Sequence, residues 1–432
     1  MNDNITTTEI VEEGKLKKNM GTLIILIISG AMIYALPYFK AYYYDTFVLH
    51  FNLTNTQMGT LGSVYGLFAI PGYIMGGFMA DRFSTRKLMT FSLMVTGILA
   101  LILLFYPPYP VVLLIHAVWG ITTIMTFWNA LVKAIRTIAS SNEQGRAFGL
   151  FEGGRGIVNI VQATAMLALF SYLSRIASDK VGLSAIIAGY AAIHILLGVL
   201  LWIRFKDPFE SKNVKGQSFV NVPVLKKALK MPTTWLVVAI IFTSYTVIIS
   251  YFYFTPYTTQ VFGATATLGA FFSIFSQYMR PIGSFTAGFA ADKFGSSKIL
   301  LICFIILTLS ILGITITPGK ASLIWIVVIC AVSLYTVMYG IQSLHYAILE
   351  EGDYSLEMTG TVTSIVCPLG YSAEFFAPLV AGPLLDKFPG VTGYKYFFTY
   401  LTAMGVIGII VTLIWLSITK ERRMELAHAR KK

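Results

Sequence analysis

The sequence contains little charge and few cysteines. Of its 432 residues, 12% are Asp, Glu, Lys or Arg, whereas an ordinary soluble domain has about a quarter. Hydrophobic residues make up 56% of the chain, and the mean hydropathy is +0.73. The three cysteines lie far apart in apolar stretches, without the spacing of a zinc site or a redox pair. This composition excludes a soluble globular domain and predicts a polytopic membrane protein.

Several motifs of catalysis and energy conversion are missing. The chain contains no G-x-x-x-x-G-K-[ST] loop for ATP phosphates, and neither H-E-x-x-H nor G-x-S-x-G. An enzyme is therefore not predicted, and no cofactor or metal is expected.

Apolar runs long enough to cross a bilayer recur along the whole chain. We expect an all-α membrane protein with twelve spans in two pseudo-symmetric halves of six, residues 1–204 and 233–432, joined by a cytoplasmic connector over 205–232. The expected spans cover residues 20–44, 57–79, 88–107, 111–136, 147–173, 183–204, 233–258, 265–290, 298–316, 322–347, 359–384 and 396–419.

The basic residues predict the orientation, because Lys and Arg beside spans are retained in the cytoplasm. With both termini inside, only five of the 32 Lys and Arg residues fall on the outer side: Arg175, Lys180, Lys320, Lys387 and Lys395. This asymmetry accounts for the net charge of +12 without a nucleic-acid partner. The lipid bilayer is the expected surrounding partner.

An internal repeat supports two related halves. Asp81 and Asp292 lie 211 residues apart, close to half the chain length, in the segments "GGFMADRFSTRK" and "AGFAADKFGSSK". Parallel repeats about an axis normal to the membrane are a recurrent design of secondary transporters, with a midplane site between the halves.

At these segments the chain resembles the major facilitator superfamily, whose motif reads G-x-x-x-D-[RK]-x-G-[RK]-x-[RK]. The residues that match it, and that the resemblance assigns to gating, are Gly77, Asp81, Arg82, Arg86, Asp292, Lys293 and Gly295. Ser84 stands where the family usually has glycine. The resemblance implies alternating access, with Asp81 and Arg82 helping to hold the outward-open state. A monomer in a bacterial cytoplasmic (inner) membrane is expected.

A finer resemblance concerns the expected fourth and fifth spans. The segment "FWNALVKAIR…EQGRAFGLFEGGRGIVN" is similar to the organophosphate and organic-anion antiporter branch of bacterial permeases, which places Lys133 and Arg155 at its basic positions and Lys40 beside its helix-one site. The expected seventh span has no arginine where phosphate-exchanging relatives carry one. The drug-exporter pattern G-x-x-x-G-P-x-x-G-G is also absent from the fifth span.

Ionisable residues inside a span are candidate functional groups, because burying them costs several kcal/mol unless they are paired or hydrated. Glu152 and Arg155 share one face of the fifth span, either as a self-neutralising pair or with Arg155 as an anion ligand. Arg280 lies near mid-depth in the eighth span and is the second predicted anion ligand. Glu374 could pair with Arg280, or could couple proton and anion binding.

The remaining candidates have strong structural alternatives. Lys40 could extend to the outer interface, and Lys133 could serve only to fix topology. Gln277 shares a helical face with Arg280, whereas Trp128 and Asn129 precede Lys133. Each neutral residue taken singly is typical of packing as well as of ligand contact.

Together these patterns predict a secondary transporter of a small organic anion: a carboxylate, sugar acid or sugar phosphate. Proton symport or exchange for a counter-anion would drive it. The predicted substrate residues are Arg155, Arg280, Lys40, Lys133, Gln277, Trp128 and Asn129, and the coupling candidates are Glu374 and Glu152. Two alternatives stay open: a neutral or sugar-like solute, and a nontransporting sensor on the same fold.

Overall fold

The computed structural model describes residues 14–140, 143–206, 222–352, 354 and 356–429, and within these ranges the chain forms helices and no strand. The all-α prediction is therefore confirmed. The helices of the N-terminal half are α1 (Lys15–Lys18), α2 (Met20–Met32), α3 (Ala35–Tyr42), α4 (Tyr44–His50), α5 (Asn55–Arg82), α6 (Thr85–Leu103), α7 (Tyr109–Gly120), the π-helix η1 (Ile121–Trp128), α8 (Asn129–Ile138), α9 (Gln144–Ile176) and α10 (Asp179–Arg204).

After the short connector helix α11 (Val222–Lys230), the second half repeats a similar order of helices. These are α12 (Pro232–Ile249), the 3₁₀ turn η3 (Ser250–Tyr253), α13 (Phe254–Phe262), α14 (Ala266–Phe294), α15 (Ser296–Ile316), η4 (Ala321–Leu323), α16 (Ile324–Leu344), η5 (Ala347–Gly352), α17 (Leu356–Gly370), α18 (Ala373–Lys387), α19 (Val391–Ile418) and α20 (Lys420–Ala429).

The number of spans agrees with the sequence except at one helix. In the described ranges ten helical segments are long and apolar enough to cross a membrane, and the bent pair α2 and α3 makes an eleventh. The expected eighth span is α14, which has 29 residues but is not among these segments. Counting α14 gives the expected twelve, so that count rests on its length and on its place among the other helices.

The first span bends by 44° between α2 and α3. Pro37 accounts for the bend, because proline has no N–H to donate to the carbonyl one turn earlier, that of Ile33, and its ring crowds that carbonyl. The backbone carbonyls around the bend consequently become available to side chains from other helices.

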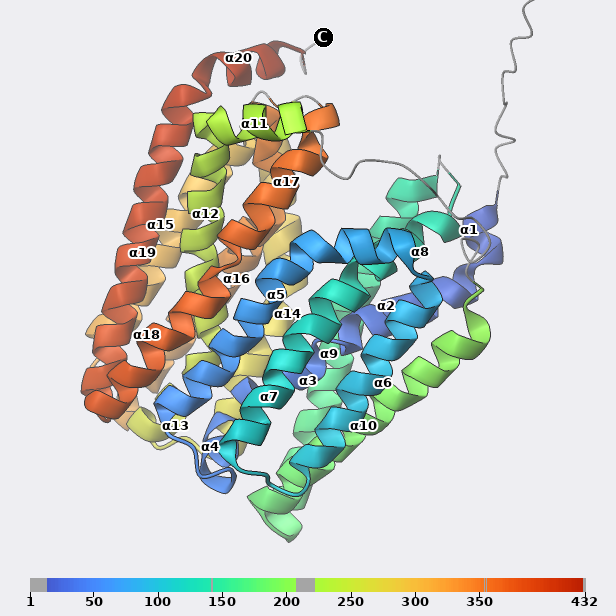
Figure 1. The fold of residues 1–432 in the computed structure, drawn as a ribbon. Coiled ribbons are helices and arrows are strands. Elements are labelled where there is room, and N and C mark those ends of the chain that lie inside the picture. The colour runs from blue at the N-terminus through green and yellow to red at the C-terminus, as the bar shows by residue number, and fades with distance from the viewer. Residues whose placement is uncertain (1–13, 141–142, 207–221, 353, 355, 430–432) are drawn as a thin grey trace, which may run out of the picture.

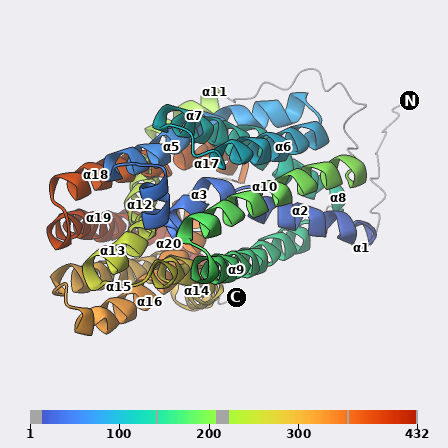
Figure 2. The ribbon, with the colours of Figure 1, turned by 90° about the horizontal axis from the view of Figure 1, so that it is seen from below.

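The two halves stand side by side (Figure 1). Helices α1, α11 and α20 lie at the end of the molecule where the described part of the chain begins and ends, called here the terminal end; α4 and α13 lie at the opposite, distal end (Figure 1). Viewed from the distal end, α5 lies beside α18 and α9 beside α14, so each pair joins the halves (Figure 2).

Glycines allow α5 and α18 to pack closely. A Cβ atom on Gly59 would come within 2.5 Å of the Pro378 carbonyl oxygen, and one on Gly66 within 3.0 Å of the Glu374 backbone. On the facing helix, a Cβ on Gly382 would lie 2.7 Å from the Asn55 carbonyl oxygen. Small residues at such crossings let helix backbones approach within a membrane, and here they fix the position of α18.

Two carboxylates tie the halves together at the distal end. Asp386 of α18 accepts hydrogen bonds from the backbone N–H groups of Asn55 at 2.9 Å and Thr56 at 2.7 Å, and from Asn55 Nδ2 at 3.0 Å. Asp45 of α4 accepts from Thr259 Oγ1 at 2.5 Å and Gln260 Nε2 at 2.8 Å, both on α13. The structure is therefore closed at its distal end.

Candidate functional site

Arg155 of α9 is held at the bend of the first span. Its Nε donates to the Gly30 carbonyl oxygen at 3.1 Å, and its Nη1 donates to Glu152 Oε1 at 2.8 Å. Arg155 is 8% exposed, whereas the Glu152 side chain is 50% exposed. The expected pair along one helical face is therefore present, with the arginine buried and its partner half in the open.

Aromatic rings surround the Arg155 guanidinium. Its Cζ lies 5.0 Å from the Trp128 ring centroid, 5.3 Å from that of Phe151 and 6.0 Å from that of Tyr34. Such cation–π contacts hold a guanidinium in place without neutralising its charge. Trp128 is the last residue of the π-helix η1, an irregularity of a kind found frequently at functional sites.

Arg280 of α14 approaches the site from the other half. Its Cζ lies 5.7 Å from the Tyr339 ring centroid, and Gln277 Nε2 donates to the Tyr339 hydroxyl at 3.1 Å. Within the described ranges no carboxylate pairs with Arg280. Arg155 and Arg280 belong to α9 and α14, which pack against each other across the two halves, so the two predicted anion ligands lie on neighbouring helices.

Glu374 does not form the expected pair with Arg280. The Tyr38 hydroxyl of α3 donates a hydrogen bond to Glu374 Oε1, so this carboxylate contacts the opposite half rather than Arg280. The eleventh span breaks between α17 and α18, which places Glu374 in the first turn of α18, where the helix dipole favours a negative charge. The break was not evident from the hydrophobic pattern of that span.

Lys40 lies with Glu374 rather than with the arginines. Its Nζ donates to the Pro37 carbonyl oxygen at 2.7 Å, and the residue is 6% exposed within the protein. Lys40 and Glu374 line the same small cavity between α3, α5, η3 and α18. In this structure the lysine therefore does not extend to the outer interface.

Two predicted substrate residues, Lys133 and Asn129, contact α5 rather than Arg155 or Arg280. Lys133 Nζ donates to the Ala80 carbonyl oxygen at 2.7 Å, at the terminal end of α5. The side chain of Asn129 faces α5 at Gly76, and its Nδ2 is buried with no hydrogen-bond partner in the described ranges. The structure thus connects both residues to α5 rather than to Arg155.

The motif segments occupy corresponding positions in the two halves. Gly295 ends α14 with φ +95°, a conformation that favours glycine, whereas Ser84 has φ −57° and its hydroxyl accepts from Lys87 N–H at the start of α6. The serine therefore replaces the family's glycine by capping the next helix. The remaining motif residues are Gly77 within α5, Arg82 at its end, Arg86 against Trp202, and the exposed Asp292 and Lys293; the side chain of Asp81 lies outside the described part.

Sequence reasoning did not single out three residues that build this site. Gly30 supplies a carbonyl to Arg155, Tyr38 supplies a donor to Glu374, and Asp386 joins α18 to α5. Of these, Asp386 could have been recognised from the sequence, because a carboxylate near the end of a span is uncommon. The Gly30 carbonyl becomes available only through a helix bend, and Tyr38 is one of many tyrosines, so the sequence marks neither of them.

Arg155 with Glu152 on α9 and Arg280 on α14 thus lie on helices that meet across the halves, while Lys40 and Glu374 share a cavity of their own, and hydrogen bonds close the distal end. Ionisable groups buried between long apolar helices are typical of a polytopic membrane transporter. The chain belongs to the Major Facilitator Superfamily, whose sequence profile matches residues 20–378, so it is a transporter and not an enzyme.

Comparison with known proteins shows which individual proteins the chain resembles. The chain is 28% identical to the inner membrane protein YihN of Escherichia coli K12, across 96% of this chain and 99% of YihN. It is 24% identical to the probable nitrate/nitrite antiporter NarK1 of Thermus thermophilus, over 60% of this chain and 58% of NarK1. A solved point mutant of the nucleoside transporter NupG shares the fold with a TM-score of 0.73 at 12% identity, covering 93% of this chain and 99% of that one.

Proposed function

We propose that this transporter moves a small organic anion, such as a carboxylate, sugar acid or sugar phosphate, across a bacterial inner membrane. Both termini lie in the cytoplasm, so the terminal end faces the cytoplasm, and the driving force is a proton gradient or exchange for a counter-anion. The observation that carries the proposal is the unneutralised positive charge at the interface between the halves.

The charge balance points to an anionic ligand. Glu152 neutralises Arg155, and Glu374 faces Lys40 across a shared cavity, which leaves Arg280 without a carboxylate. A cation inside a membrane protein costs several kcal/mol unless it is paired or hydrated, and Arg280 is only partly exposed. An anion bound near Arg280 would remove this cost, and Arg155 would approach the same anion from the other half.

Two arginines on opposite halves also favour alternating access. Without a ligand the two guanidinium groups repel each other, and an anion between them replaces this repulsion with two attractions. Because Coulomb interactions strengthen as water is excluded, the attraction increases as the halves close. Gln277 and Trp128 would orient the ligand beside the two arginines.

Glu152 and Glu374 are the proposed coupling groups. Glu152 is half exposed, so it can leave Arg155 for water when an anion arrives. Glu374 is buried, so a change in its charge acts on the contact between the halves. The motif residues Asp81, Arg82 and Asp292 are proposed to control the terminal end.

Purified protein tests this proposal. We expect carboxylates, sugar acids or sugar phosphates, but not neutral sugars or nucleosides, to raise the melting temperature, because ligands stabilise the state that binds them. Proteoliposomes should take up the stabilising anion. Arg280→Gln should abolish that uptake, whereas Arg175→Gln, an exposed arginine at the distal end of α9, should not change it.

Two results would contradict the proposal. Stabilisation by an uncharged nucleoside or sugar alone would favour the neutral-solute alternative, and anion uptake that survives Arg280→Gln would remove Arg280 from the site. Size-exclusion chromatography and the melting temperature without ligand establish whether the variant folds.

A further inference from the structure

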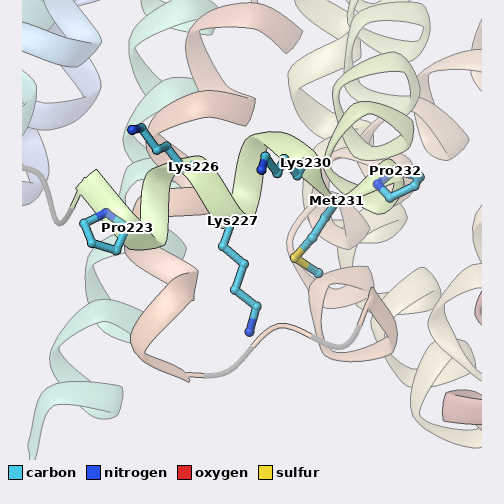
Figure 3. A pocket seen from close by; sticks show the side chains of 6 residues that line it. All are labelled: Pro223, Lys226, Lys227, Lys230, Met231 and Pro232. Carbon is cyan, nitrogen blue, oxygen red and sulfur yellow. The ribbon is translucent and has the colours of Figure 1, made fainter.

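We infer that the cavity between Lys40 and Glu374 is a buried hydration site, in which an ordered water bridges the lysine ammonium to the glutamate carboxylate and fastens the two halves together. This inference does not depend on which solute is transported. Other pockets are less informative: the groove around α11 contains Lys226, Lys227 and Lys230, but these side chains point to different sides of the helix (Figure 3).

The cavity has room for water. About 40 Å³ is open to the centre of a water molecule, and about 10–15 Å³ on that measure is enough to hold one water. At least one water therefore fits beside Lys40 and Glu374. The residues lining it are Tyr38, Lys40, Ala41, Tyr44, Met58, Gly62, Tyr65, Ile249, Phe252, Tyr253, Glu374 and Pro378.

The polar groups in the wall leave hydrogen-bonding capacity for such a water. An ammonium can donate three hydrogen bonds, and in the described ranges Lys40 Nζ makes one, to the Pro37 carbonyl oxygen. The Glu374 carboxylate accepts from Tyr38 through Oε1. Lys40 and Glu374 are each more than nine-tenths buried, yet they do not lie within ion-pair distance of each other.

A single bridging water can form hydrogen bonds with both charged groups at once. Two opposite charges that share a low-dielectric cavity without contact remain partly unsatisfied, and a buried water typically makes about three hydrogen bonds to such groups. One water can accept from the Lys40 ammonium and donate to the Glu374 carboxylate. Tyr44, Tyr65 and Tyr253 also line the cavity, although the hydroxyls of Tyr44 and Tyr65 are hydrogen-bonded elsewhere, to Asn55 and Thr123.

The bridge would join the two halves between α3 and α18. Lys40 belongs to the first half and Glu374 to the second, and the bridge lies beside the direct contact from Tyr38 to Glu374. When the distal end opens, α18 moves away from α3 and the shared cavity is lost. The water-mediated pair therefore stabilises the closed distal end, and removing either charge should favour opening.

A double-mutant cycle on the conformational equilibrium tests the pairing. Spin labels attached through Phe105→Cys and Lys387→Cys, exposed positions on opposite halves at the distal end, report opening as a longer distance in lipid nanodiscs. Cys303, Cys330 and Cys367 are first replaced by serine. No solute is added, so failure of the anion proposal would not affect the result.

Two substitutions remove the charges with little change in shape. Lys40→Met keeps the length of the side chain, and Glu374→Gln keeps an oxygen that accepts from Tyr38. Each should raise the ratio of open to closed molecules roughly fivefold to thirtyfold, the range that corresponds to one or two kcal/mol. The double variant should resemble either single variant, because both remove the same bridge. Independent, additive effects would overturn the inference.

A third variant tests the water itself. A Cβ at Gly62 would stand 3.4 Å from Pro378 Cγ, an ordinary contact, so Gly62→Ala adds a methyl group to the cavity wall without a clash. It should narrow the space for water and shift the equilibrium toward opening, in the same direction as Lys40→Met. Gly149→Ala, at a position with open space around it, serves as the control and should have no effect. A Gly62→Ala variant as closed as wild type would refute the water bridge.

Discussion

Asp386 provides the strongest test of how the distal end is held closed. Its carboxylate accepts two backbone N–H groups at the N-terminus of α5, from Asn55 and Thr56, although it belongs to α18 of the other half. The N-terminus of a helix carries a partial positive charge and unpaired donors. Asp386 therefore completes a helix of the other half, and it can do so only while the distal end is closed.

The size of this effect follows from the exposure of the contact. A hydrogen bond to a charged group contributes about 1.5–3 kcal/mol in general, but Asp386 is exposed to solvent, which weakens it. We therefore expect Asp386→Ala to destabilise the closed state by about 1–2 kcal/mol, which shifts the equilibrium roughly fivefold to thirtyfold toward opening. The effect should be partial, because Asp45 still bonds Thr259 and Gln260.

Chemical labelling measures this opening. Met58 of α5 is 4% exposed in the closed structure, so a cysteine introduced by Met58→Cys should react with a polar maleimide mainly after the distal end opens. Asp386→Ala should raise the labelling rate by the same fivefold to thirtyfold. Asp179→Ala is the matched control, since Asp179 lies in the first turn of α10 at the distal end and, among the described residues, makes no hydrogen bond or ion pair to the other half. Equal labelling in Asp386→Ala and wild type would refute the reasoning.

Three further predictions concern other parts of the chain. Glu152→Gln should increase anion affinity up to about fivefold in thermal-shift titrations, because a half-exposed ion pair competes with the ligand by no more than about 1 kcal/mol; unchanged affinity would show that Glu152 does not compete. Gly283→Ala should lower stability by about 1–3 kcal/mol, since its Cβ would lie 2.0 Å from the Thr336 carbonyl oxygen, whereas Gly153→Ala, with open space around it, should not. Hydrogen bonds from Ser140 and from Leu16 N–H lower the pKa of Glu143, so its carboxylate is ionised and bound to α1 at pH values above the usual glutamate pKa, and this contact is lost as the pH falls through the lowered pKa. The protection of the amides of residues 15–19, measured as their hydrogen-exchange rate relative to an unstructured peptide at the same pH, should therefore fall in acid in wild type but not in Glu143→Gln.

Local features of the chain were predictable from the sequence. Glu152 and Arg155 are three residues apart on one helix, so helical geometry alone brings them together. The apolar runs located the spans because each must cross the bilayer, and α14 is less apolar because it contains polar residues such as Gln277 and Arg280. Ser84 can stand in place of the family's glycine because its side chain caps α6. This role is evident from the backbone angles of the structure and not from the sequence.

The sequence by itself determined that this is a helical membrane protein made of two related halves, with arginines inside its spans, because hydropathy and helical spacing are local properties of a chain. Only the tertiary structure decided which charges meet. Arg280 lies over Tyr339, and Glu374 accepts from Tyr38 and shares a cavity with Lys40, because the bend at Pro37, the break before α18 and the close packing at Gly59, Gly66 and Gly382 set how the helices approach. Contacts between residues more than three hundred positions apart depend on that packing, which no local pattern encodes.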